Sequence, residues 1–277
     1  MPVQATRLSR RMRGGAQAHL LACEDGRFYV TKFLNNPQHR RILANEWAAS
    51  VLLAHLGIAA PQARVIRVDA AFLAAQPDVH FQLGSRRVPV EPGIHFGSLF
   101  PGDPDRDAVY DYLPDALLAS VVNLAHFAGV LVFDKWTANS DARQAIFFRR
   151  CIRDFLDEPA APNRKGFIAQ MVDHGYIFDG PHWEFPDSPL QGLYFRPHVY
   201  QHIRSLDDFE PWLSRARHCP EQILDDVLRT TPRPWIDGEE DEWERLLEKL
   251  YARRRKIEGL LLATVRARPQ SFPFWRG

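Results

Sequence analysis

Hydrophobic runs separated by short polar turns dominate the first hundred residues. Residues 17–22 and 27–33 are two such runs, and an Asp-Gly pair between them is typical of a hairpin turn. Further strand-like runs occur at residues 64–68 and 81–100, where glycine and proline interrupt them. The N-terminal part is therefore predicted to be rich in β-strands.

One helix is predicted inside this strand-rich part, at residues 40–56. Apolar side chains recur there every three to four positions, which is the period of a helix with one buried face: Leu43, Trp47, Val51, Leu52 and Leu56. Gly57 stands where a helix commonly ends in a left-handed glycine.

The pattern becomes helical after a Pro-Gly-Asp-Pro turn that begins at Pro101. Residues 113–133 are apolar without an internal proline and predict a buried helix. A polar segment follows, and then two apolar runs at residues 145–149 and 166–172 predict strands. Residues 239–265 predict a last helix, acidic at its start and basic near its end, which complements the helix dipole.

These patterns together predict an α+β fold of two lobes. Residues 1–100 would form a strand-rich N-terminal lobe with one helix, and residues 101–277 a mainly helical C-terminal lobe. The polar, proline-containing stretch at residues 157–165 predicts a loop. A chain of 277 residues is long enough for two lobes that share a cleft.

Composition narrows the class of partner. Lys and Arg number 35 against 34 Asp and Glu, so the net charge of +1 favours neither nucleic acid nor a membrane surface as a partner. No apolar stretch reaches 18 residues. Three scattered cysteines form neither a disulfide framework nor a CxxC metal pair, which predicts a reducing, cytoplasmic location.

Phosphate-binding chemistry is suggested by three features of the N-terminal part. Gly14 and Gly15 precede a strand, and glycine lets backbone N–H groups approach phosphate oxygens, although an ordinary turn would have the same sequence. Lys32 lies within the strand-like run 27–33. Glu46, 14 residues later on the predicted helix, could fix the Lys32 ammonium group if both side chains face a cleft; otherwise both are solvated surface residues.

The polar segment at residues 134–144 lies between an apolar helix and an apolar strand. A catalytic loop would explain it: Asp141 would position and deprotonate an attacking hydroxyl, and Gln144 or Asn139 would help to hold a metal ion. A structural polar network would explain the same residues, because unpaired polar groups near a core cost free energy.

Asp173 follows the end of the second apolar strand and precedes His174-Gly175. A carboxylate presented at such a turn suits Mg²⁺, which prefers carboxylate and phosphate oxygens, although a simple turn is an equally good account of this feature alone. The order along the chain strengthens the interpretation, because a glycine turn, strand lysine, helix glutamate, polar loop and Asp-x-Gly follow one another at kinase-like spacing.

The combination resembles the HipA-like kinases, in particular the small stand-alone kinase domains of bacteria. The resemblance covers residues 13–178 and rests on five pieces: a Gly-Ala-Gln phosphate loop (Gly14, Gly15, Ala16, Gln17), the ATP lysine in its strand (Lys32), the helix glutamate (Glu46), a catalytic loop (residues 133–147) and a magnesium motif (residues 171–175).

The resemblance implies a two-lobed kinase that binds ATP and Mg²⁺ and most often phosphorylates Ser or Thr of a protein. One position departs from the family pattern: an Asn usually stands five residues after the catalytic Asp, and position 146 is Ile. Either Gln144 replaces that Asn, or Asp134 and Asn139, which have this spacing, form the pair. Asp141 fits the motif better as the catalytic residue.

Two other functions remain compatible with the sequence. The departure at Ile146 would suit a pseudokinase that binds nucleotide and acts as an interaction module. A kinase acting on a small molecule or a lipid would share the same core. The sequence does not identify the phosphoacceptor.

Overall fold

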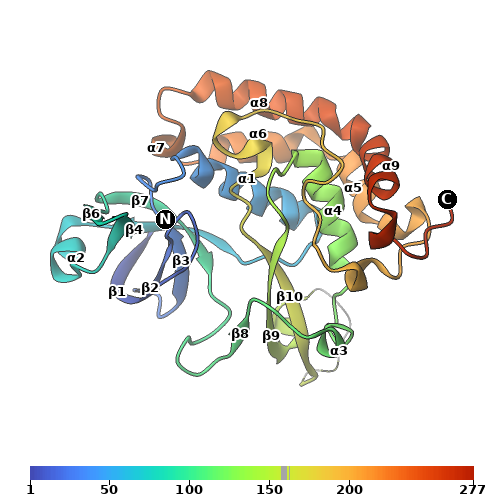
Figure 1. Ribbon diagram of the computed structural model, residues 1–277. Helices are drawn as coiled ribbons and strands as arrows, with labels where there is room; N and C mark the ends of the chain where they lie inside the picture. The colour runs from blue at the N-terminus through green and yellow to red at the C-terminus, as the bar shows by residue number, and fades with distance from the viewer. Residues whose placement is uncertain (157–160, 162) are drawn as a thin grey trace.

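The computed structural model describes residues 1–156, 161 and 163–277, and it shows an α+β fold with two lobes (Figure 1). The smaller lobe is built mainly of strands from the first hundred residues. The larger lobe gathers most of the helices and a second small sheet. The predicted fold class is confirmed.

The smaller lobe contains a closed barrel. Its strands, in spatial order, are β1 (Val3–Arg11), β2 (His19–Cys23), β3 (Phe28–Lys32), β7 (Gly93–Leu99) and β4 (Ala63–Val68). The parallel pairing of β4 with β1 closes it, and the other neighbours are antiparallel. Tyr29, Phe33 and Ile66 are fully buried in its core. In a closed sheet every strand has a neighbour on both sides, so no strand edge is left free.

Strand β1 was not predicted, because its sequence has no apolar run. Ala5 faces the core with 3% exposure, whereas Arg7 and Arg10 face solvent. Three further elements lie beside the barrel: α2 (Ala70–Ala75), β5 (His80–Leu83) and β6 (Arg86–Pro89). The composition of β1 does not predict a strand, and its pairing with β2 and with the more distant β4 holds it in place.

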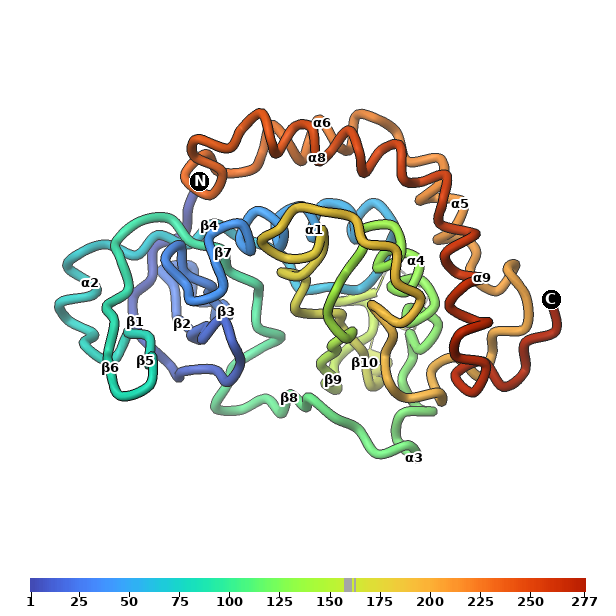
Figure 2. The backbone as a smooth tube through the Cα atoms, turned by 45° about the horizontal axis from the view of Figure 1, so that its top comes forward, coloured from blue at the N-terminus to red at the C-terminus, as the bar shows by residue number. Residues whose placement is uncertain are grey.

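Helix α1 (Arg41–Leu56) confirms the predicted helix and its end, since Gly57 has a left-handed φ of 72°. It belongs to the N-terminal sequence but packs among helices of the larger lobe (Figure 2). These helices are α5 (Trp212–Arg217), α6 (Glu221–Thr230) and α7 (Arg233–Ile236). Helix α1 therefore joins the two lobes.

The helix predicted at residues 113–133 is wrong as a single element. The structure has two helices, α3 (Asp115–Leu118) and α4 (His126–Thr137), separated by an irregular segment. Asn123 fixes that segment, because its side-chain amide donates to the Ala169 carbonyl at 2.8 Å and accepts from the Ala169 N–H at 2.9 Å. The buried Asn123 amide thus interrupts the helix that the surrounding apolar residues predict.

The two strands predicted in the C-terminal part are confirmed as β9 (Gln144–Cys151) and β10 (Lys165–Val172), with β8 (Val109–Tyr110) at the edge of the same sheet. Gln144 pairs with Val172 in the antiparallel register. This register brings the end of the polar loop beside Asp173. The loop predicted at residues 157–165 lies largely outside the described residues.

The C-terminal region is helical, as predicted, but its last helix is broken. Helix α8 (Glu240–Arg253) and helix α9 (Ile257–Ala267) are separated by a 3₁₀ turn. The 3₁₀ turns of the described chain are Ile152–Asp154, Ile177–His182, Pro197–Tyr200, Leu206–Phe209, Arg254–Lys256 and Pro269–Ser271. Within the described residues, every helix is too short or too polar to cross a membrane.

Acid should destabilise the smaller lobe through its buried histidines. His19 and His95 are fully buried, and burial lowers the pKa of each to about 4 from 6.5. Their folded pKa lies below the unfolded one, so the stability they contribute is complete above pH 6.5 and is lost as pH falls toward 4. The variant His95→Gln keeps an acceptor for the Leu34 N–H. Between pH 7 and 5, its free energy of unfolding, measured by chemical denaturation, should fall less steeply than that of the unaltered chain, by up to about 1.4 kcal/mol per pH unit.

The matched control for this experiment is His182→Gln, because His182 is exposed. Its unfolding free energy should follow that of the unaltered chain across the same pH range. Equal losses in all three proteins would contradict the role given to His95.

Candidate functional site

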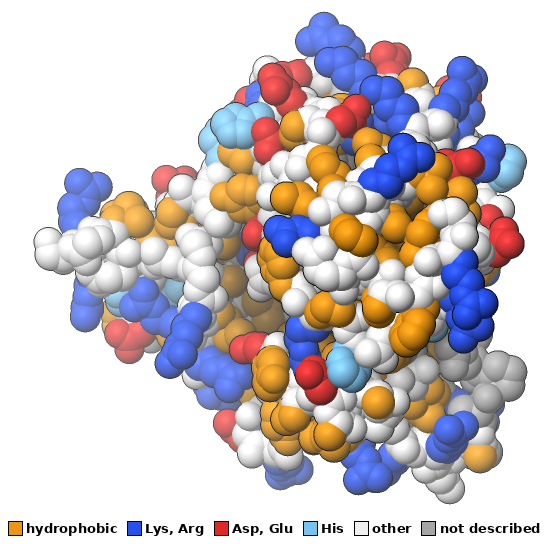
Figure 3. All heavy atoms as spheres, turned by 45° about the vertical axis from the view of Figure 1, so that its right-hand side comes forward, with side chains coloured by type: hydrophobic (Ala, Val, Ile, Leu, Met, Phe, Trp, Pro, Cys, Tyr) orange, Lys and Arg blue, Asp and Glu red, His pale blue; other side chains and the backbone are white. Residues whose placement is uncertain are grey.

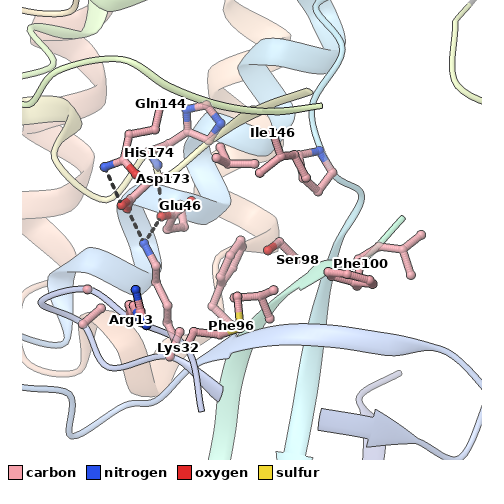
Figure 4. A pocket seen from close by; sticks show the side chains of 18 of the residues that line it. Arg13, Lys32, Glu46, Phe96, Ser98, Phe100, Gln144, Ile146, Asp173 and His174 are labelled. Carbon is pink, nitrogen blue, oxygen red and sulfur yellow. Dashed lines mark hydrogen bonds and ion pairs between the residues drawn. The ribbon is translucent and has the colours of Figure 1, made fainter. Parts of the chain in front are cut away.

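A cavity of about 540 Å³ lies between the two lobes. Its lining comes from the β1–β2 loop, strands β3 and β7, helix α1 and the ends of β9 and β10 (Figure 4). Of the site residues predicted from sequence, these line it: Gly14, Gly15, Ala16, Gln17, Lys32, Glu46, Gln144 and Asp173. Asn139 and Asp141 lie outside the lining.

Lys32 connects three elements at the closed end of the cavity. Its ammonium group forms an ion pair with Glu46 on α1 and a second one, at 2.7 Å, with Oδ1 of Asp173 after β10. Glu46 also accepts a hydrogen bond from the His174 N–H at 3.0 Å. Residues 141 positions apart in sequence thus converge on one cation.

The charges of this cluster follow from burial and from each other. Burial opposes the charged form of Lys32, but Glu46 and Asp173 outweigh it and raise the Lys32 pKa. The Lys32 charge lowers the pKa of Asp173, which is therefore a carboxylate. Burial raises the pKa of Glu46, and Lys32 opposes that rise. A cation and an ionised Asp173 therefore face the cavity together.

Asn45 anchors α1 where Glu46 meets Lys32. Its amide nitrogen donates to the carbonyls of Gly175 at 2.8 Å and Ile177 at 3.1 Å. It also donates to the Gly180 carbonyl at 3.0 Å, and its oxygen accepts from the Trp183 indole at 2.9 Å. The turn after Asp173 is therefore bonded to the helix that carries Glu46.

Arg41, at the start of α1, makes a second anchor to the larger lobe. Its guanidinium pairs with Glu239 at 2.9 Å and Glu242 at 2.7 Å, and it donates to the Pro181 carbonyl at 2.9 Å. It also lies 4.1 Å above the Trp183 ring. Together with Asn45, this arginine fixes the orientation of α1.

Gly175 allows this close approach. A Cβ atom added there would lie 2.5 Å from a methyl carbon of Ile42 on α1. Any side chain at this position would push the helix away from the turn that carries Asp173.

The β1–β2 loop turns tightly over the cavity. Gly14 has a φ of 121°, which suits only glycine, and the N–H of Gln17 donates to the Gly14 carbonyl at 3.1 Å. The N–H groups of Gly15 and Ala16 have no hydrogen-bond partner among the described residues. The Gln17 side chain is bound to the backbone of Gln82 in both directions, at 2.8 and 2.7 Å. Gln17 therefore anchors the loop, while its neighbours leave donors free.

Asp134 is the centre of a buried network. It is 1% exposed, forms an ion pair with Arg143, and accepts from Asn139 at 2.9 Å. The Asn139 side-chain oxygen in turn accepts from the Asp141 N–H at 3.2 Å. Both polar ends of Asn139 are thus used within the loop.

Asp141 and Gln144 are more accessible than Asp134. Asp141 is partly exposed, and one carboxylate oxygen caps the Ala142 N–H at 2.7 Å. Gln144 is exposed and donates to Oδ2 of Asp173 at 3.0 Å. Asp173 has a left-handed φ of 59°, which aspartate tolerates, and its carboxylate lies between Lys32 and Gln144.

His174 is buried, and both of its ring nitrogens have partners within the protein. Its Nε2 lies 3.0 Å from the Met171 carbonyl and its Nδ1 lies 3.0 Å from Arg143, so Nε2 carries the proton and Nδ1 accepts. Burial and the Arg143 charge hold the His174 pKa well below its usual value. This histidine therefore orients the turn and has no free nitrogen for proton transfer.

Lys135 is an anchoring residue that the sequence reasoning missed. Its ammonium group donates to three backbone carbonyls, those of Ser188, Pro189 and Gln191, at 2.6 to 3.1 Å. Burial lowers the Lys135 pKa to about 8. The sequence signal for this role was a lysine beside Asp134 at the end of an apolar helix. Lys135 fixes the segment that passes next to Asp141.

The apolar walls of the cavity were also not predicted. Val30, Phe96, Phe100 and Ile146 line it, with Ser98 among them (Figure 4). They are ordinary strand residues, so a single sequence holds no signal that separates them from the core.

The carboxylate of Asp173 and the side-chain oxygen of Gln144 fit Mg²⁺, which prefers hard oxygen ligands. No group of three His, Cys, Asp or Glu side chains in the part of the chain that is described could hold a metal ion by itself. A cation here would therefore depend on oxygens of a bound ligand for the rest of its coordination.

Comparison with known proteins gives one family and several related folds. The model of the HipA-like kinase family matches residues 6–147. No curated protein matches the sequence significantly. The Helicobacter pylori proinflammatory kinase CtkA is similar in structure, with a TM-score of 0.51 and 11% identity over 95% of this chain and 96% of that one. Hydra Fam20 with sugar has a TM-score of 0.51 and 11% identity, over 99% and 88%.

Removal of the Asn45 anchor should destabilise the chain and loosen the site. Asn45→Ala leaves three carbonyls and the Trp183 N–H without their partner, and an unsatisfied buried polar group costs about 1–3 kcal/mol. We expect a loss of at least about 2 kcal/mol in the free energy of unfolding, measured by denaturant titration. Gln201→Ala, at an exposed position, is the control, and equal stability of the two variants would contradict the anchoring role.

Proposed function

The chain belongs to the HipA-like kinase family, and from this premise we propose that it is a Ser/Thr protein kinase that uses ATP with Mg²⁺ in the cavity between its lobes. Kinase-type phosphoryl transfer and ATP follow from the family and the fold. The convergence of Lys32, Glu46 and Asp173 in one cavity is the observation that carries the proposal.

In this proposal Lys32 and the β1–β2 loop bind the phosphates. The Lys32 ammonium group is held by Glu46 and supplies positive charge. The free N–H groups of Gly15 and Ala16 supply uncharged donors above it. Gly14 allows the turn and Gln17 fixes it to β5, so the loop is pre-organised for an anion.

We assign the Mg²⁺ site to Asp173 with Gln144. Gln144 is preferred to Asn139 because it borders the cavity and contacts Asp173, whereas the side chain of Asn139 is bound to Asp134 and Asp141. When bound, Mg²⁺ neutralises charge on the phosphate oxygens. Rotation of the Gln144 amide would turn its oxygen toward the cation in place of its nitrogen.

Asp141 is our choice for the residue that orients the acceptor hydroxyl and accepts its proton. The alternative, Asp134, is buried and shared by Arg143 and Asn139, so it has no access to a substrate. Asp141 is partly exposed and keeps one carboxylate oxygen without a described partner. The network around Asp134 would hold Asp141 in position.

The phosphoacceptor and the lobe boundary complete the proposal. We propose a protein Ser or Thr as acceptor, with a small molecule or lipid as the competing class, and a boundary near residue 100, where β7 leads into the larger lobe. One face of the larger lobe carries basic and acidic side chains interspersed with hydrophobic ones (Figure 3), which would suit a protein surface of mixed character.

Loss of either carboxylate should abolish most of the activity. Asp173→Asn and Asp141→Asn are each expected to lower phosphoryl transfer from labelled ATP by at least about 10²-fold, the scale of losing one preorganised electrostatic contact. Asp225→Asn, on the exposed face of α6, is the control. Full activity of both variants would refute the assignment. If the unaltered chain binds ATP and transfers no phosphoryl group to any protein or small molecule, it is a nucleotide-binding module instead.

Asp134 should behave as a structural residue. Asp134→Asn leaves Arg143 buried without its countercharge, and breaking a buried ion pair costs about 3–5 kcal/mol. We expect this loss in the free energy of unfolding, with a change below about 1 kcal/mol for Asp141→Asn. The reverse order of stabilities would exchange the roles of the two aspartates.

A further inference from the structure

The segment that links the lobes beside the cavity begins at the end of β7, and its first two N–H groups are already bonded. The Leu99 N–H donates to the Gln62 carbonyl at 2.9 Å. The Phe100 N–H donates to the Phe28 carbonyl at 2.8 Å. Both residues line the cavity, yet neither has a backbone donor left for a ligand.

The next three residues of this connecting segment (residues 99–103) continue the same pattern. Pro101 has no N–H. The Gly102 N–H donates to the Phe100 carbonyl at 2.8 Å, and the Asp103 N–H donates to the Asp107 carboxylate at 2.7 Å. Five consecutive residues therefore have no free amide donor, whereas the carbonyl oxygens of Phe100 and Pro101 each keep a second lone pair.

The closed barrel accounts for the first two of these bonds. Strand β7 is paired with β3 up to Leu99 and with β4 up to Ser98. An edge strand would leave every second N–H free, whereas an interior strand leaves none. Local turn bonds and Pro101 remove the remaining donors from this wall of the cavity.

Ser98 supplies a donor at the same wall. It lies on β7 between Phe96 and Phe100, opposite Val30 of β3, and its side chain points into the cavity (Figure 4). Its hydroxyl has no hydrogen-bond partner among the described residues. A hydroxyl both donates and accepts, so it can complement either kind of polar atom on a ligand.

We propose that the Ser98 hydroxyl hydrogen-bonds the purine base of the nucleotide and is the donor that reads it, because the connecting segment has no free backbone amide. The base edge of adenine carries ring-nitrogen acceptors and an exocyclic amine. The carbonyls of the connecting segment can accept from the amine, but among the described residues of β7 and this segment that line the cavity, only Ser98 has a free donor. This inference rests on the proposed ATP site and identifies the residue that determines its base preference.

The test is a cycle of protein and ligand changes. Dissociation constants of ATP are measured by calorimetric titration for the unaltered chain, Ser98→Ala and Ser50→Ala, with Mg²⁺ present. Ser50 is the matched control, because it borders the same cavity but its hydroxyl donates to the Trp47 carbonyl at 2.7 Å. The same constants are measured for 1-deaza-ATP, 3-deaza-ATP, 7-deaza-ATP and purine riboside triphosphate, which each lack one polar group of the base.

We expect Ser98→Ala to weaken ATP binding by about 2- to 12-fold, the range of one net hydrogen bond, and Ser50→Ala to leave it unchanged. For the one analogue that lacks the bonded atom, Ser98→Ala should have no effect, because the contact is already absent. Equal ATP affinity of Ser98→Ala and the unaltered chain would overturn the inference. So would a loss of ATP-like size with all four analogues.

Failure of the proposed ATP site would look different. In that case the unaltered chain would bind none of the five nucleotides, and both proposals would fall together. ATP binding without phosphoryl transfer would contradict the kinase activity alone. Thermal unfolding of Ser98→Ala without ligand, at the same midpoint as the unaltered chain, ensures that a weaker affinity reflects the site and not the fold.

Discussion

The Lys32 ammonium group, held between Glu46 and Asp173, is the interaction on which the arrangement of the site depends. A buried cation is stable only when carboxylates and hydrogen-bond acceptors surround it. One partner lies on a helix in the N-terminal sequence, and the other lies in a turn 141 residues after Lys32. The chain must therefore bring barrel, helix and second sheet together to satisfy one charge.

A second buried pair organises the loop beside this cluster. Arg143 is bonded to Asp134, to the Val172 carbonyl and to His174, so it ties the polar loop to the end of β10. Each of the two cations has its own carboxylate partner inside the fold. Because an unpaired charge in this environment is costly, the two networks admit few alternative geometries.

The sequence predicted those features that are local. Lys32 in a strand, Glu46 on a helix and Asp173 after a strand follow from runs of apolar residues and from spacing. Tertiary bonds decided the rest. Asn123 breaks a helix that the apolar pattern predicts, because its amide binds Ala169 in a neighbouring strand. Strand β1 has no apolar run and is ordered by its two partners. The motif favours Asp141 over Asp134, and the burial of Asp134, which the sequence did not predict, adds a physical reason.

The first half of helix α1 is bound to the larger lobe, through Arg41, Asn45 and the contact of Trp47 with Thr230. Swinging this helix outward to separate Glu46 from Lys32 would break all of these bonds at once. The direction in which Glu46 faces Lys32 is therefore coupled to the packing of the larger lobe.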